Sequence, residues 1–363
     1  MSTVTLTPID MAELHKALRR KLPVHRRDLS ALDLSGIDFG GAMLVECRLR
    51  GARLHQASFG KTIVQGCDLL GMDLSDCQLD GANFAQCDLR DCNFGPAAVD
   101  ELTLADCDLR GAHFRDKAIS KSHLVKNRFA GTDFNGTKWL KVVALESDFT
   151  DTRLAGAELR TAVFHGTDFR SADLRGLTLH ECILVKCDLS GHDLSGRTLS
   201  RTTFMHCDLS ASKLADATLT QGTFIGTRLH GTDLRGARID QSMFYQADFD
   251  AADLRGADAS VSVFQKATFK DTTLQGAKLA MSQWQHSTHD GSDFRDCDMP
   301  HADLSHIQGE DCRFAGATLS RARLHKVQLN RGALHGADTT NAEGDNKKLA
   351  QAEQRSLQTE ARL

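Results

Sequence analysis

The 363-residue sequence has little of several residue types. It contains 4 Pro, 1 Tyr and 2 Trp but 18 Phe and 29 Gly, and this narrow choice of residues is typical of a repeat. Neither sign of charge dominates, since 44 Lys and Arg face 48 Asp and Glu, which argues against a basic nucleic-acid-binding protein. No apolar run approaches the ~18 residues that a membrane span needs.

Signals for export, catalysis and cofactor binding are also missing. Residues 1–8 lack the basic and apolar regions of a secretory signal, so we expect a cytoplasmic protein whose 11 Cys stay reduced. The sequence contains no P-loop, dinucleotide fingerprint or nucleophile elbow. We therefore expect no enzyme activity and no cofactor.

A period of five residues runs through the sequence. Every fifth residue from Leu29 to Leu334 lies on one phase, without insertion or deletion, and most of these central positions hold Leu or Phe. All 18 Phe and both Trp lie on this phase. The residue two positions earlier is usually small, as Ala82 is before Phe84. A period of five fits neither a helix nor a strand, so these two positions are expected to face a core and the other three to face water.

This pattern resembles the pentapeptide-repeat family, whose consensus is A(D/N)LXX; residues 252–256 read Ala-Asp-Leu-Arg-Gly. The resemblance implies an all-β fold, a right-handed quadrilateral β-helix of about 15 coils. Four pentapeptides form each coil, so residues 20 apart stack in columns. Gly follows the central residue on two faces far more often than on the other two, which predicts two kinds of corner.

The repeat divides the chain into three segments. Residues 1–27 are expected to form a capping segment whose helix begins with Thr7 as N-cap and Pro8 in the first turn. Residues 28–338 form the solenoid. Residues 339–363 are a helical or flexible tail, and three roles stay open for it: a cap, a dimerisation helix or a frayed end.

Cysteine and histidine clusters were considered as disulfide or metal sites. Every Cys occupies the small inward position, where a buried thiol packs well, so we expect packing rather than disulfides. His286 and His306 are 20 residues apart and therefore vertical neighbours, but the sequence offers no third ligand beside them. We interpret this region, where His289 takes a central position, as a locally imperfect coil and expect no metal.

One of the four faces carries apolar residues beside its central positions. We call this surface the apolar face; toward the N-terminus it includes Met43, Val45 and Ile63. Its candidate protein-binding residues are Val125, Val143, Leu145, Val163, Ile183, Val185, Met205, Ile225, Met243, Tyr245 and Val263. A flat sheet would favour β-branched residues there, but not Met, Leu or Tyr. A continuous exposed apolar strip is typical of an interface.

A second face carries a column of acids, which we call the acidic column. Its members are Asp68, Asp88, Asp108, Asp148, Asp168, Asp188, Asp208 and Asp248. Family members that imitate DNA bind type II topoisomerases, so this column is the candidate site of a DNA mimic. Arginines on the same face and the net charge of −4 argue against that interpretation.

The sequence therefore predicts a non-catalytic, rigid scaffold or adaptor that binds a protein partner, or itself as a homodimer, along the apolar face. The resemblance suggests one setting, in which a bacterial secretion component or effector is the partner. Direct nucleic-acid binding is not expected. The alternative is a DNA-mimicking binder or inhibitor of a type II topoisomerase such as gyrase.

Overall fold

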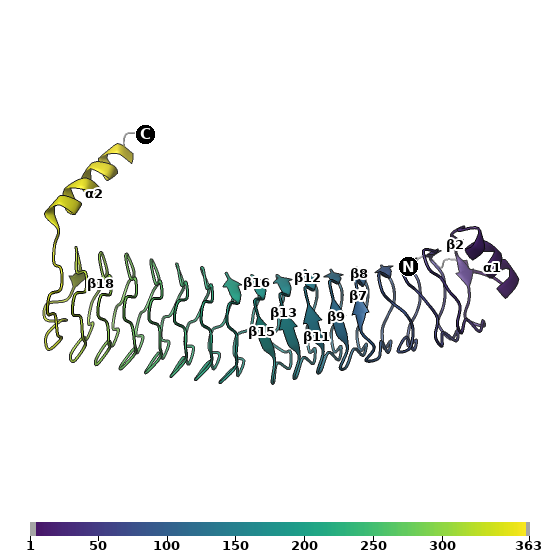
Figure 1. The fold of residues 1–363 in the computed structure, drawn as a ribbon, viewed down its shortest axis with the longest axis horizontal. Coiled ribbons are helices and arrows are strands. Elements are labelled where there is room, and N and C mark those ends of the chain that lie inside the picture. The colour runs from purple at the N-terminus through teal and green to yellow at the C-terminus, as the bar shows by residue number, and fades with distance from the viewer. Residues whose placement is uncertain (1–4, 361–363) are drawn as a thin grey trace. The chain divides into compact units, whose positions relative to one another are not determined.

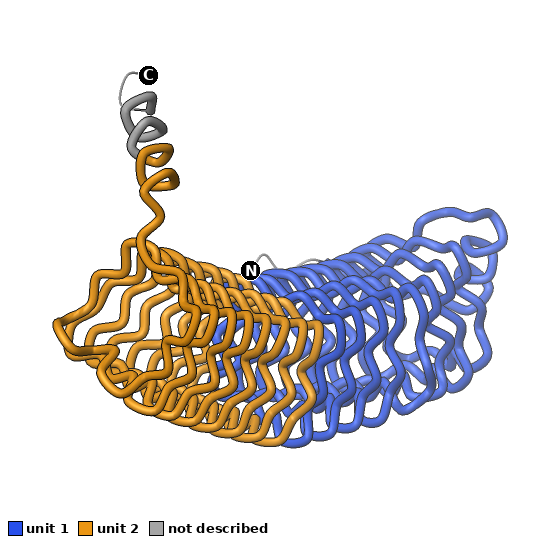
Figure 2. Tube along the Cα trace, turned by 60° about the vertical axis from the view of Figure 1, so that its left-hand side comes forward, with its two compact units in different colours: residues 1–189 blue, residues 190–363 orange. Residues whose placement is uncertain are grey.

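The computed structural model describes residues 5–360. The chain forms two compact units, residues 1–189 and residues 190–363, which are coloured separately in Figure 2. Each unit is a stack of coils, and Figure 1 shows β11, β13 and β15 side by side in unit 1. None of the helices among the described residues is long and apolar enough to cross a membrane.

Backbone hydrogen bonds repeat with the coil in both units. In unit 1 the amide of Leu34 donates to the carbonyl of Arg53 at 2.8 Å, and in unit 2 the amide of Leu254 donates to the carbonyl of Thr273 at 2.7 Å. Parallel bridges join residues 20 positions apart, as in the pair Asp33 and Arg53. The predicted parallel β-helix of four pentapeptides per coil is confirmed.

Short strands line two faces of unit 1. One sheet contains, in order, β2, β4, β5, β6, β8, β10, β12, β14 and β16, and the other contains β7, β9, β11, β13 and β15; all neighbours are parallel. The strands of unit 1 are β1 (Thr7–Pro8), β2 (Val24–His25), β3 (Arg27–Asp28), β4 (Met43–Val45), β5 (Ile63–Gln65), β6 (Asn83–Ala85), β7 (Val99–Asp100), β8 (Thr103–Ala105), β9 (Ala118–Ser120), β10 (His123–Val125), β11 (Lys138–Leu140), β12 (Val143–Leu145), β13 (Glu158–Arg160), β14 (Val163–His165), β15 (Thr178–His180) and β16 (Ile183–Val185). Unit 2 contains β17 (Thr203–Met205), β18 (Gln308–Gly309) and β19 (Gln328–Leu329), and isolated bridges form most of its ladder.

The central and small positions form the core, as predicted. In unit 2 the rings of Phe204, Phe224, Phe244, Phe264 and Trp284 form one continuous stack, with successive centroids 4.3 to 5.2 Å apart. All eleven cysteines are buried, as their predicted packing role requires. The thiols also bond the backbone, since Sγ of Cys92 donates to the carbonyl of Leu69 at 3.0 Å.

The prediction of two kinds of corner is confirmed in part of the solenoid. One residue of each corner adopts a left-handed backbone on all four faces, as four successive corners show: φ is 70° at Gly41, 52° at Glu46, 91° at Gly51 and 56° at Gln56. Gly relieves the steric cost of this backbone but is not required for it. The corners still differ in residues 98–185: those on the two Gly-rich faces are closed turns, as where the Ala112 amide donates to the Leu109 carbonyl at 2.9 Å, whereas those after the strands on the two Gly-poor faces are bends. In unit 2 closed turns also occur on the Gly-poor faces, as where the Thr227 amide donates to the Phe224 carbonyl at 3.2 Å.

The N-terminal segment begins differently from the prediction. Thr7 and Pro8 do not start the helix; they form β1, which pairs with β3. Helix α1 spans Met11–Arg19 and Asp10 is its N-cap, with Oδ1 accepting from the amide of Glu13 at 2.7 Å. Asp and Thr both accept a hydrogen bond from the third residue of a helix, so residue type alone does not show whether Thr7 or Asp10 is the N-cap.

The C-terminal ladder continues beyond the predicted boundary at residue 338. A bridge joins Arg323 to Glu343, and the amide of Leu324 donates to the carbonyl of Glu343 at 2.7 Å. Helix α2 then spans Lys347–Glu360, with the side chain of Asn346 accepting from the amides of two following residues. Residues 361–363, which end the predicted helical stretch, lie outside the described residues.

A buried lysine interrupts the small inward positions of unit 1. Lys117 is 2% exposed, and its Nζ donates to the carbonyls of Phe94 and Ala97 at 2.9 and 2.5 Å. Burial lowers the pKa of Lys117 from 10.5 to about 8. The backbone after Phe94 leaves the regular bridge pattern and supplies these carbonyls, which explains how the coil accommodates the amine.

Candidate functional surfaces

The apolar face of unit 1 follows the longer sheet. In strands β12, β14 and β16, Val143 pairs with Val163, and Val163 pairs with Ile183. In the neighbouring column, Val125 of β10 pairs with Leu145 of β12. Ile183 is 43% exposed, and the other four are half-buried. Because neighbouring parallel strands lie ~4.8 Å apart, these side chains form a contiguous apolar patch.

The apolar patch has two explanations, the local preference of a sheet for β-branched residues and a role in binding. The face coincides with a regular sheet, so β-branched Val and Ile are favoured for local reasons. That preference does not explain Leu145 or Met43, and Met43 and Ile63 are each 39% exposed. Sheet propensity therefore accounts for part of the composition but not for Leu145 or for the exposed Met43.

In unit 2 the backbone of the apolar face is joined mainly by isolated β-bridges rather than by strands. Met243 bridges Val263, and Met243 is 42% exposed. Met205, Ile225, Tyr245 and Val263 are half-buried. Lys266 Nζ lies 5.4 Å from the centre of the Tyr245 ring, which places a cation beside the aromatic side chain.

Sequence inspection missed two exposed apolar side chains in unit 2. Val261 is 47% exposed and Met281 is 55% exposed, and they occupy the same corner in successive coils, two residues before Val263 and Gln283. They do not directly flank a central position, which is where the apolar face was predicted. The corner residue next to the face would have revealed them.

Arginine forms ion pairs with five of the eight residues of the acidic column, namely Asp88, Asp108, Asp168, Asp188 and Asp208. Asp88 and Asp108 each accept paired hydrogen bonds from the arginine two residues later, at 2.6 to 2.8 Å. Asp168 is held in the same way by Arg170, whose hydrogen bonds keep the pKa of Asp168 below its usual range. In unit 2, Arg228 lies 2.6 Å from Asp208. These ion pairs reduce the free negative charge of the column.

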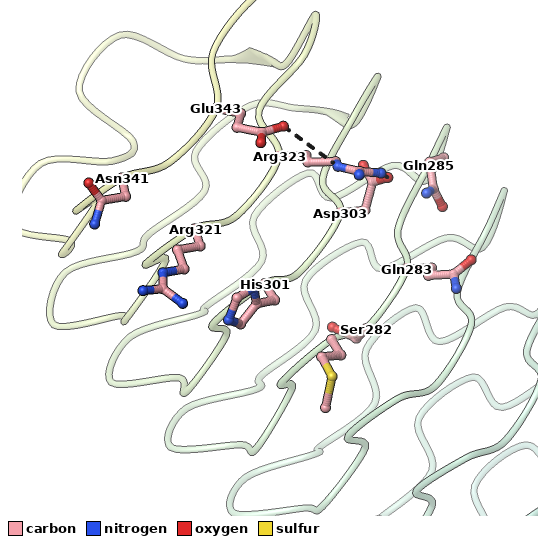
Figure 3. A pocket seen from close by; sticks show the side chains of 10 residues that line it. Ser282, Gln283, Gln285, His301, Asp303, Arg321, Arg323, Asn341 and Glu343 are labelled. Atoms are coloured by element: carbon pink, nitrogen blue, oxygen red, sulfur yellow. Dashed lines mark ion pairs between the residues drawn. The ribbon is translucent and has the colours of Figure 1, made fainter.

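A surface pocket of about 600 Å³ lies in the last coils of unit 2 (Figure 3). Its lining is polar, and its charged groups contact one another: Arg323 lies 3.6 Å from Asp303 and 3.7 Å from Glu343. His301 and Arg321 line the same pocket from neighbouring coils. These groups are arranged as compensating charges, without a nucleophile and base in contact.

The histidine region separates into a core residue and a surface cluster. His289 is fully buried, stacks on Phe269 with centroids 5.0 Å apart, and has Nε2 2.7 Å from Ser287 Oγ. Burial lowers the pKa of His289 to about 3, so the ring is neutral. It fills a central position in the coil.

His306 belongs to the surface cluster. Its ring stacks on His286 with centroids 4.6 Å apart and lies edge to face with His325 at 5.3 Å. Glu353 of α2 reaches this cluster: its Oε1 lies 3.0 Å from His306 Nε2 and its Oε2 lies 2.5 Å from Lys326 Nζ. The hydrogen bond from Lys326 lowers the pKa of Glu353 to about 2, so its carboxylate is charged. The third ligand-type group that the sequence did not reveal comes from α2.

Family models and solved structures with similar folds were compared with the chain. A model described as a pentapeptide repeat region matches residues 37–114 and 197–279. A model of eight pentapeptide repeats matches residues 128–166, 147–184 and 162–201. No curated protein sequence matches the chain.

Three solved structures are similar to between 30% and 64% of this chain. A trypsin-treated variant of QnrB1, a plasmid-mediated fluoroquinolone resistance protein, is 20% identical, with 59% of this chain and 96% of that chain covered and a TM-score of 0.38. HetL, a pentapeptide repeat protein involved in heterocyst differentiation regulation in the cyanobacterium Nostoc, is 22% identical, with 64% and 87% covered and a TM-score of 0.24. A pentapeptide repeat protein of the Arabidopsis thaliana thylakoid lumen is 33% identical, with 30% and 66% covered and a TM-score of 0.16.

The family models together match more than half of the sequence, in the same segments where the five-residue phase and the 20-residue coil are seen. The chain therefore belongs to the pentapeptide-repeat family.

Proposed function

We propose that this protein is a non-catalytic scaffold or adaptor that binds another protein, or a second copy of itself, along the apolar face. The observation that carries the proposal is the contiguous patch on β12, β14 and β16, where Ile183 is 43% exposed between half-buried neighbours. Apolar side chains beside a polar rim are typical of protein interfaces.

The backbone under this patch supports docking. Strands β12 and β14 each pair with a strand on both sides and β16 pairs with β14, and the side chains below are closely packed, as in the stack of Phe164 on Trp139 at 5.7 Å. A surface that is already ordered loses little conformational entropy on binding. An accessory role in a bacterial secretion or effector-loading system is the setting that we propose for such a partner.

The test compares two triple variants from the same coils. Val143→Ser, Ile183→Ser and Val185→Ser together remove the patch, while Glu158→Ser, Arg160→Ser and Thr178→Ser change exposed residues of the neighbouring face. We expect the first triple to lose partner capture and self-association, measured by affinity purification and light scattering, with unchanged circular dichroism. The second triple should behave as the unaltered protein. Equal capture by both triples would refute the proposed interface.

The topoisomerase alternative predicts a different result. Purified protein should inhibit or protect gyrase in a supercoiling assay, and replacing Asp148, Asp168 and Asp188 by Asn should weaken that effect. The pairing of Asp168 with Arg170 reduces the free negative charge that imitation of a DNA duplex requires. We therefore favour the apolar face as the binding site. Inhibition or protection of gyrase by micromolar concentrations of this protein would reverse this choice.

A further inference from the structure

Three side chains with metal-ligating atoms converge where α2 meets the last coils of unit 2. One ligand atom from each of His306, His325 and Glu353 lies within 4.8 Å of the other two. Nε2 of His306 is 3.0 Å from Glu353 Oε1, and Nε2 of His325 is 3.5 Å from Glu353 Oε2. The carboxylate therefore lies between two imidazole nitrogens.

The two histidines are held in place by the coil. The amide of His306 donates to the carbonyl of His325 at 2.8 Å, which fixes the two backbones relative to each other. The side chain of His325 is 4% exposed, so its ring has little room to turn away. The stacked ring of His286 supports His306 from the preceding coil. Preorganised ligands of this kind reduce the cost of binding an ion.

One buried atom in this cluster lacks a partner. Nε2 of His325 makes no hydrogen bond among the described residues, although it faces Glu353. Nδ1 of the same ring accepts from the amide of Asn346 at 3.0 Å, and Asp345 Oδ1 lies 3.7 Å from it. Because Nδ1 accepts this amide, the neutral ring carries its proton on Nε2, and an ion can bind Nε2 only after that proton moves to Nδ1. Nδ1 then gives up the hydrogen bond from Asn346 and donates to Asp345 Oδ1 instead.

The donor set selects the class of ion. Two imidazole nitrogens and one carboxylate oxygen suit zinc and related divalent transition metals, which take three protein ligands and a water. Calcium and magnesium prefer oxygen ligands throughout. We propose that His306, His325 and Glu353 bind one zinc-class divalent ion, which fastens α2 to the last coils of unit 2.

Lys326 is the internal competitor for this ion. Its ammonium contacts Glu353 in the structure, but its side chain is 37% exposed, so it can turn to solvent when a divalent ion replaces it. The ion would carry more charge to the same carboxylate and would also satisfy His325 Nε2. The site involves no residue of the apolar face, so the two proposals stand or fall separately.

The test is a calorimetric titration of the EDTA-treated full chain with zinc sulfate near pH 7.5. We expect one equivalent to bind, with affinity reduced at least about tenfold by Glu353→Gln or by His306→Asn. His230→Asn, at an exposed histidine of an earlier coil, is the matched control and should leave the affinity unchanged. Absence of stoichiometric binding, or equal affinity in all variants, would overturn the proposal.

A second measurement tests the fastening of α2. Hydrogen exchange of the amides in residues 347–353 should slow when zinc is added to the unaltered protein, and Glu353→Gln should remove this protection. Glu353 is on a surface helix, so its replacement leaves the coils folded, which circular dichroism verifies. Zinc binding without slower exchange in this segment would contradict the proposed role of α2.

Discussion

At the scale of single residues, the corners require a backbone that most side chains tolerate poorly. Val261 is a clear case, because it is β-branched, its φ is 61°, and its side chain is 47% exposed. The left-handed region costs an ordinary L-residue roughly 1–2 kcal/mol, while Asn adopts it more readily. Val261 therefore destabilises its own corner.

We expect Val261→Asn to raise the midpoint of urea unfolding, by an amount that corresponds to about 1 kcal/mol. Val263→Asn, two residues along in the same coil, is the control, since it lacks a positive φ and should not raise the midpoint. A lower midpoint for Val261→Asn would show that apolar contacts of Val261 outweigh its backbone strain.

Lys117 gives a pH-dependent prediction. Its pKa is about 8 in the folded protein and near 10.5 when exposed, so below pH 8 the buried charge opposes folding fully. Between these values the unfolded chain binds more protons, and the free energy of unfolding rises with pH. Lys117→Met should remove that rise. Parallel pH profiles of the unfolding midpoint for both proteins would contradict this account.

The sequence predicted the core positions but not the surroundings of Lys117. The core positions of Phe244 and Cys92 followed from the five-residue phase, because a repeat applies the same constraint many times. The environment of Lys117 did not, since its partners are backbone carbonyls near residue 97 that the side-chain pattern does not report. The repeat predicts which side chains are buried, but where a coil is irregular it does not predict their hydrogen-bond partners.

At the scale of elements, both helices were predicted, but the N-cap of α1 and the contacts of α2 were not. A capping helix was predicted and Leu14 of α1 is fully buried, but the N-cap is Asp10 rather than Thr7. For α2 the helical stretch was predicted, while its contact with His306 through Glu353 was not. That contact depends on the direction of the chain after residue 343, which no periodicity describes.

The N-cap of α1 can be tested directly. Asp10→Ala removes the acceptor for the Glu13 amide and should destabilise α1 by about 1 kcal/mol. Asp10→Asn retains a side-chain oxygen and should remain close to the unaltered protein. Amide exchange in residues 11–19 measures the difference. Faster exchange for both variants to the same extent would assign the effect to charge rather than to the cap.

At the scale of the whole molecule, the repeat determines the fold and leaves the surface free to vary. The ladder of coils needs the central and small positions, whereas the outward positions can be ion pairs, as with Asp108 and Arg110, or apolar, as with Ile183. The sequence could therefore predict a candidate binding surface as a face, and its role in binding stays a prediction. The identity of the partner was not, because a flat surface carries no reaction chemistry.

The most direct measurement places a photo-reactive amino acid at position 183, on the apolar face, or at position 160, on the neighbouring face of the same unit. Our account predicts that irradiation of cells joins the protein to a second polypeptide through position 183 and not through position 160. Cross-linking through position 160 alone, or equally through both, would contradict the assignment of the apolar face as the binding surface.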